Sequence, residues 1–112
     1  MSELSEKKCV PCEGGVPPLT PQEAAGLRRQ LHADWILADD GKHLTRSYKF
    51  RDFYRVMSFV GAVAHVANVE DHHPDLKLGY DYVHISYSTH AIGGLSENDF
   101  ICAAKIDRIA VR

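Results

Sequence analysis

The sequence has few of the features that would place it in a specialised class of protein. Its longest apolar stretch, residues 56–69, is interrupted by Ser58, His65 and Asn68, and it is shorter than the roughly 20 residues that cross a bilayer. Residues 1–8 are polar, so no secretory signal is visible. Neither sign of charge dominates, because 13 Lys and Arg residues stand against 15 Asp and Glu residues. We therefore expect a cytoplasmic protein with no general electrostatic attraction to membranes or nucleic acid.

Cysteine is also scarce, and the sequence contains only three. An odd number does not suggest a disulfide scaffold. Cys9 and Cys12 form a C-x-x-C, the spacing of redox dithiols and of half a zinc site, but one such pair supplies only two ligands. Cys102 stands alone in a segment with a helical pattern, where we expect it to be a small core residue. We interpret the Cys9–Cys12 pair as not central to the activity.

The length and composition predict one globular domain. With 112 residues, 45% hydrophobic and 25% charged, the chain is close to the average of soluble domains. Residues 1–18 are polar and then rich in glycine and proline, which predicts a loosely held arm. Residues 19–112 are predicted to form the folded domain.

Three segments have the pattern of a helix. Residues 20–32 begin with a capping threonine, a proline and an acidic residue in the first turn. In residues 51–69, apolar side chains recur three or four positions apart and predict a buried stripe. That stripe is Phe53, Met57, Val60, Ala64 and Ala67. Ser96, followed by Asp99 three residues later, resembles the capping box of a last helix.

The remaining patterned segments predict four strands. Residues 35–38 and 43–50 flank an Asp-Gly turn, and residues 76–78 and 83–87 form a second extended pair. The predicted order is helix, two strands, helix, two strands, helix. Because each strand pair is a hairpin, we expect an α+β fold with a four-stranded antiparallel sheet and three helices on one face.

The densest group of titratable side chains is residues 70–75, which include His72, His73 and Pro74. Pro74 disfavours a helical conformation at the preceding residue, so the long helix must end here. Histidine has an ordinary pKa of about 6.5, so adjacent imidazoles near neutral pH suit proton transfer. His90 follows the last predicted strand and precedes a glycine-rich loop, a good place to present a side chain to a ligand.

Other interpretations of these residues stay open. A polar helix end with two histidines is often simply solvated, and an acid such as Asp99 in the first turn of a helix interacts favourably with the helix dipole. A metal on His72, His73 and His90 is a further alternative, although zinc motifs on helices more often use i, i+4 spacing. The P-loop, dinucleotide-binding and nucleophile-elbow patterns are absent from the sequence.

Taken together, these residues resemble a known family. His72-His73-Pro74, then Ser88-Thr89-His90, then residues 94–99, and finally Ala103 with Ile106-Asp107 are similar in order and spacing to pterin-4a-carbinolamine dehydratase. The resemblance covers residues 19–112. It implies the same α+β fold, homodimers or homotetramers, and no metal or organic cofactor.

The resemblance also implies a reaction and roles for individual residues. Water would be removed from 4a-hydroxytetrahydropterin to give quinonoid dihydropterin, which regenerates the cofactor of aromatic amino acid hydroxylases. His72 and His90 would exchange protons at C4a and N5, and His73 would hold and polarise the pterin. The substrate-binding group would further include Asp99, which would orient a histidine from behind, and the backbone of Ser88 and Thr89, which would bond the pyrimidine edge.

The sequence departs from the family pattern at one position. Several relatives carry a carboxylate four residues before the histidine pair, whereas this sequence has Asn68 there. In addition, animal members of the family bind a transcription factor through the surface otherwise used for self-association. The alternative function is therefore a binding module without enzymatic activity.

Overall fold

The computed structural model describes residues 4–11 and 17–109. Their elements occur in the order η1 (Leu4–Glu6), α1 (Pro21–Arg28), β1 (Ile36–Leu37), β2 (Leu44–Lys49), α2 (Phe53–Glu70), β3 (Asp75–Leu78), β4 (Tyr82–Tyr87), η2 (His90–Ile92) and α3 (Glu97–Asp107). The predicted order of helices and strands is confirmed. None of the helices in these ranges is long and apolar enough to span a membrane.

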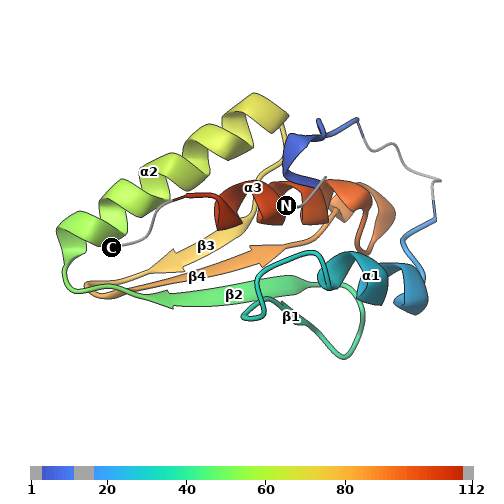
Figure 1. Ribbon diagram of the computed structural model, residues 1–112, viewed down its shortest axis with the longest axis horizontal. Helices are drawn as coiled ribbons and strands as arrows, with labels where there is room; N and C mark the ends of the chain where they lie inside the picture. The colour runs from blue at the N-terminus through green and yellow to red at the C-terminus, as the bar shows by residue number, and fades with distance from the viewer. Residues whose placement is uncertain (1–3, 12–16, 110–112) are drawn as a thin grey trace.

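The strands form one antiparallel sheet in the order β1-β2-β4-β3. Figure 1 shows α2 and α3 lying across one face of this sheet, with α1 beside α3 at the β1 edge. The pairing of Tyr48 with Val83 and of Arg46 with Ile85 fixes which side chains face the helices. The α+β fold with its four-stranded sheet is therefore confirmed.

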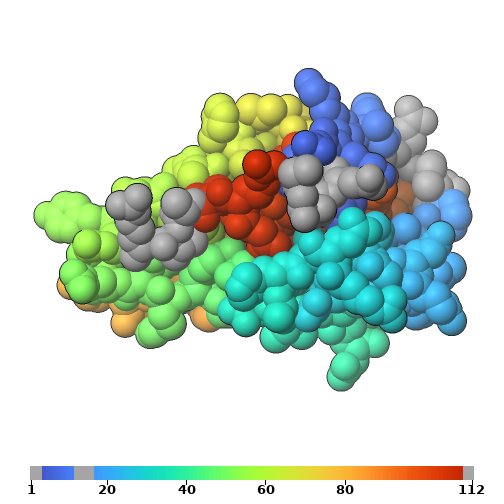
Figure 2. All heavy atoms as spheres, in the orientation of Figure 1, coloured from blue at the N-terminus to red at the C-terminus, as the bar shows by residue number. Residues whose placement is uncertain are grey.

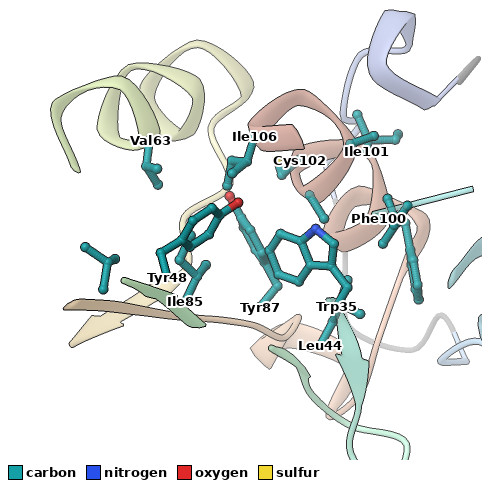
Figure 3. Close-up of a cluster of buried hydrophobic side chains, with 14 of the residues drawn as sticks. Trp35, Leu44, Tyr48, Val63, Ile85, Tyr87, Phe100, Ile101, Cys102 and Ile106 are labelled. Carbon is teal, nitrogen blue, oxygen red and sulfur yellow. The ribbon is translucent and has the colours of Figure 1, made fainter. Parts of the chain in front are cut away.

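The core lies between the sheet and the two helices α2 and α3. Figure 3 shows the rings of Trp35, Tyr48 and Tyr87 directed from the strand layer toward α3, where Cys102 and Ile106 meet them. Trp35 and Tyr87 are at most 1% exposed, and their ring centroids are 6.3 Å apart. Cys102 is fully buried, as expected for a small core residue.

Helix α2 buries a different stripe from the one predicted. Its buried residues are Val56, Phe59, Val63 and Ala67, whereas Phe53 and Met57 are more than two-fifths exposed. The helix carries apolar residues around much of its circumference, so two stripes offset by one position fit the same spacing. Of the predicted stripe, only Ala67 is among the buried residues.

The first helix also ends earlier than predicted. It stops at Arg28 rather than near residue 32. Beyond this end Leu31 is buried, and the backbone N–H of His32 donates to the Asp107 carboxylate at 2.9 Å. These contacts with the core replace a further helical turn.

The described part of the N-terminal segment is packed against the domain. Leu4 is 1% exposed, and the carbonyl oxygen of Ser5 accepts a hydrogen bond from Lys105 Nζ at 2.8 Å. The carboxylate of Glu97, on α3, pairs with Lys7. In Figure 2 the blue N-terminal segment lies against the yellow end of α2. This packing contradicts the expectation of a loosely held arm for residues 4–11.

Candidate functional site

A pocket of about 510 Å³ lies where the C-terminal ends of α2 and β4 meet η2. Its lining includes His72, His73, Ser88, Thr89 and His90. Five of the six predicted site residues therefore come together around one cavity. They come from two segments that are separated in sequence by the hairpin of β3 and β4. The sixth, Asp99, lies behind the wall.

The end of α2 places the histidine pair at this pocket. Asp71 caps the helix in the left-handed conformation, with φ 51°. The backbone N–H of His72 then returns to the carbonyl oxygen of Ala67 at 3.1 Å. Pro74 begins the extended chain that leads into β3. The pair therefore stands at a fixed change of direction between helix and sheet.

His72 is held by a carboxylate. Its Nε2 lies 2.7 Å from Oδ1 of Asp99, whose side chain is fully buried. The other oxygen, Oδ2, accepts from the Thr89 hydroxyl at 2.8 Å and from the Ser96 backbone N–H at 3.0 Å. The predicted capping box at Ser96 is present. Asp99 thus belongs both to the start of α3 and to the His72 network.

The surroundings of His72 favour its protonated form. Burial alone would lower its pKa, but the hydrogen bond and negative charge of Asp99 outweigh burial, so the pKa of His72 is raised above its ordinary value. Its ring is also stacked on Tyr87, with centroids 5.9 Å apart and an angle of 4° between the planes. His72 is therefore a positioned imidazole with a bias toward the charged state.

His73 and His90 are more open to solvent. Both are exposed, and His90 begins η2, directly after Thr89. The turn is closed by Thr89, whose N–H donates to the Gly94 carbonyl at 2.8 Å and whose carbonyl accepts from Ile92 N–H at 3.2 Å. Gly94 is required there, because a Cβ would lie 2.7 Å from Cβ of Pro18. The exposed imidazole of His90 thus stands on a well-fixed turn.

The geometry bears on two of the residues predicted to bind substrate. Asp99 is fully buried and is not part of the pocket lining, so it does not contact a ligand in the pocket directly. The backbone N–H and carbonyl of Thr89 are already bonded within the turn, and Ser88 lines the pocket at the strand end.

The N-terminal segment forms a second wall of the pocket, which was not predicted from the sequence. Cys9, Val10 and Pro11 line the pocket. Asn98 clamps Val10 by accepting from its N–H at 3.1 Å and donating to its carbonyl at 2.6 Å, and Glu70 accepts from the Cys9 N–H at 2.8 Å. Residues 9–11 are not part of a helical or strand pattern in the sequence. Nothing in the sequence therefore indicated that they pack against the pocket. Cys12, the partner of Cys9 in the C-x-x-C, lies outside the described residues.

The titratable side chains of the described residues do not gather as metal ligands. Across residues 4–11 and 17–109, no three His, Cys, Asp or Glu side chains come together as a metal site requires. The arrangement instead joins one imidazole fixed by a carboxylate to two accessible imidazoles around a cavity. Such groups are suited to giving and taking protons from a bound molecule.

Comparison with known proteins gives one consistent family. The family model described as pterin 4 alpha carbinolamine dehydratase matches residues 17–109. A relative from Nitrosomonas eutropha, named "Putative pterin-4-alpha-carbinolamine dehydratase", is 53% identical over 109 residues, which are 97% of this chain and 95% of the relative. A relative of the same name from Legionella pneumophila is 46% identical over 110 residues, 98% of this chain and 97% of the relative.

Solved structures agree on the fold. A crystal structure from Brucella melitensis, described as a transcriptional coactivator/pterin dehydratase, has a TM-score of 0.74 at 34% identity and covers 80% of this chain and 94% of that one. A pterin dehydratase-like protein described as a RuBisCO assembly factor in the alpha-carboxysome has a TM-score of 0.58 at 22% identity, covering 68% and 88%. The second likeness shows the fold alone.

Proposed function

This chain belongs to the pterin-4a-carbinolamine dehydratase family, and we propose that it removes water from 4a-hydroxytetrahydropterin by histidine acid–base catalysis. The product is quinonoid dihydropterin. The observation that carries the proposal is the convergence of His72, His73 and His90 on one pocket, with Asp99 behind the first of them.

The reaction requires two proton transfers. The 4a-hydroxyl is a poor leaving group until an acid protonates it, and the proton on ring N5 must be taken by a base. A positioned group of either kind contributes typically about 10² to 10⁴ in rate. Two imidazoles beside a flat heterocycle can therefore supply both the acid and the base.

The two proton-transfer roles divide between His72 and His90. Asp99 holds Nε2 of His72 and raises its pKa, so His72 carries the proton that goes to the departing hydroxyl. Nδ1 is then the ring nitrogen of His72 that serves the substrate. His90, exposed on its turn, takes the proton from N5.

The remaining lining residues hold the ring. His73 lies beside His72 at the pocket, where it polarises the pterin, and the Ser88 backbone at the end of β4 bonds the pyrimidine edge. The proposal extends to a cytoplasmic homodimer or homotetramer that recycles tetrahydropterin for an aromatic amino acid hydroxylase. These wider features rest on the resemblance to the family.

The direct test is a dehydration assay. Purified protein is added to freshly generated 4a-hydroxytetrahydropterin, and the absorbance change is compared with the spontaneous reaction. We expect a large acceleration that a chelator leaves unchanged. A rate equal to the spontaneous one would refute the proposal. Activity that vanishes with chelator and returns with zinc would replace it by metal catalysis.

The binding-module alternative has a different signature. The Brucella relative is described as both a coactivator and a dehydratase, so the two functions need separate readouts. A purely binding role does not require imidazoles, so substituting His72, His73 and His90 together would leave the cellular phenotype intact. Loss of the phenotype together with the dehydratase activity supports the enzyme.

A further inference from the structure

Two thiols that the proposed dehydration does not use lie next to each other beneath the pocket. The Sγ atoms of Cys9 and Cys102 are 3.6 Å apart, although the residues are 93 positions apart in sequence. Cys9 is partly buried and lines the pocket, whereas Cys102 is fully buried in α3. A disulfide has a sulfur–sulfur distance of about 2.05 Å, so only a small movement separates this pair from a bond.

The backbone around Cys9 fixes this approach. Its N–H donates to Glu70 at the end of α2, and the next residue, Val10, is clamped by Asn98. Sγ of Cys9 also lies 3.7 Å from the Asn98 carbonyl oxygen, and Sγ of Cys102 lies 3.9 Å from the carbonyl oxygen of His72. The two thiols therefore connect the N-terminal wall of the pocket to the part of α3 behind His72.

We propose that Cys9 and Cys102 are a dithiol–disulfide site that fastens this wall to α3 when a low-molecular-weight disulfide such as oxidised glutathione reacts with them. The Cys9 thiolate attacks one sulfur of oxidised glutathione and releases one glutathione thiolate. The Cys102 thiolate then attacks the Cys9 sulfur and releases the second. The protein loses two protons and two electrons, and the reagent is reduced to two glutathione molecules.

The surroundings of Cys9 set the conditions for this exchange. Its hydrogen bond with Cys102 and its burial raise the pKa of the Cys9 thiol. Because the thiolate is the attacking species, the reaction is slow near neutral pH and accelerates as the pH increases. The competing product is a bond between Cys9 and Cys12, which the C-x-x-C spacing allows in an unfolded chain.

Disulfide mapping of the folded protein tests the site. Wild type and Cys12→Ser are incubated with oxidised glutathione at pH 8.5, quenched with acid and digested for mass spectrometry. We expect a Cys9–Cys102 linked peptide in both proteins and none in Cys9→Ser. A Cys9–Cys12 link, a stable glutathione adduct on Cys9, or unreacted thiols in the folded wild type would overturn the proposal.

The bond also has a thermal signature. It closes a loop of nearly the whole chain, which restricts the unfolded state strongly, so the Tm of oxidised Cys12→Ser is expected to rise by about 10 °C and to return on reduction. An unchanged Tm in protein that carries the mapped bond would show that it does not fasten the segment to the fold. Cys9→Ser, treated in parallel, is the matched control for nonspecific effects of the reagent.

The consequence for the pocket rests on the proposed function. Because Cys9 lines the pocket, oxidation is expected to change the KM for 4a-hydroxytetrahydropterin by about threefold or more relative to the reduced protein. The kcat is expected to stay within about twofold. An unchanged KM would overturn the link to the pocket. Mapping requires no pterin, so an inactive reduced wild type would refute the dehydratase proposal while leaving the disulfide site standing.

Discussion

Helix α3 carries a carboxylate in a polar network at each of its ends, and the two carboxylates have different kinds of partner. At the start, Asp99 accepts from Thr89 and the Ser96 backbone and pairs with His72. At the end, Asp107 accepts from Trp35 Nε1 and from Arg46, each at 2.7 Å. Both ends are well bonded, but only Asp99 holds a histidine that lines the pocket.

The helix dipole explains why the partners differ. A carboxylate is favoured at a helix start and disfavoured at a helix end. The first turn of α3 already stabilises the Asp99 carboxylate. Asp99 therefore does not need a permanent cation, and its partner is His72, which can change its charge. Asp107 lies at the unfavourable end, and the permanent cation of Arg46 compensates for it. The network beside the cavity therefore differs from the other by its titratable partner rather than by burial alone.

The largest expected effect is loss of the two imidazoles proposed for proton transfer. The double substitution His72→Ala with His90→Ala is expected to lower kcat by about 10³-fold or more, because both the proposed acid and the proposed base are removed. The control is His84→Ala, an exposed histidine on the uncovered face of the sheet, which is expected to keep its rate within about twofold. Equal losses in the two proteins would contradict the assignment.

Exchanging each carboxylate for its amide compares the two ends of α3 directly. Asp99→Asn is expected to lower kcat by about tenfold or more, because the charge that raises the pKa of His72 is lost. Asp107→Asn is expected to keep kcat within about twofold but to lower the free energy of unfolding by about 2 kcal/mol, because Arg46 loses the charge of its partly buried partner. Steady-state kinetics and denaturant unfolding measure the two effects. A loss of kcat in Asp107→Asn with an unchanged kcat in Asp99→Asn would contradict the comparison.

The pH dependence of stability is expected to follow His72. Its pKa in the folded protein is raised, so its contribution is fully present below the ordinary value of about 6.5 and is lost as the pH rises through the folded value. The difference in unfolding free energy between wild type and His72→Gln is therefore largest in mild acid and shrinks as the pH rises. Denaturant titrations at several pH values measure it. A difference that grows with pH would mean that the shift has the opposite sign.

A smaller effect is expected from the N-terminal wall of the pocket. Asn98→Ala removes both hydrogen bonds to the Val10 backbone, so the wall loosens and KM for the pterin is expected to rise by about threefold to tenfold, with kcat nearly unchanged. Glu97→Ala, which removes the exposed pair with Lys7, is the neighbouring control. A fall in kcat without a change in KM would assign Asn98 to the chemistry instead.

Much of the fold was predictable because its signals are local. The capping residues Thr20 and Ser96 mark helix starts that the structure has. The Asp-Gly turn also lies where expected, with Gly41 in the left-handed region at φ 70°. Along β4, buried Val83 and Ile85 alternate with exposed His84, as the period of two in a strand requires. Each of these features depends on residues only a few positions apart.

The missed features depend on contacts between distant segments. Leu4 is an isolated apolar residue in a polar stretch, so no pattern reveals that it enters the core. The clamp of Val10 by Asn98 and the approach of Cys9 to Cys102 join opposite ends of the chain. The sequence likewise did not reveal which histidine Asp99 would hold. The meeting of the histidines was anticipated only through the family resemblance, since spacing along the chain does not determine it.

The most direct test is to observe all three imidazoles while a pterin binds. Histidine side-chain NMR signals are assigned by single substitutions and followed during titration with a stable dihydropterin. The signals of His72, His73 and His90 are predicted to shift together with one saturation curve, while that of His84 stays in place. Saturable binding that leaves any of the three pocket signals unmoved would contradict a single site built from these histidines.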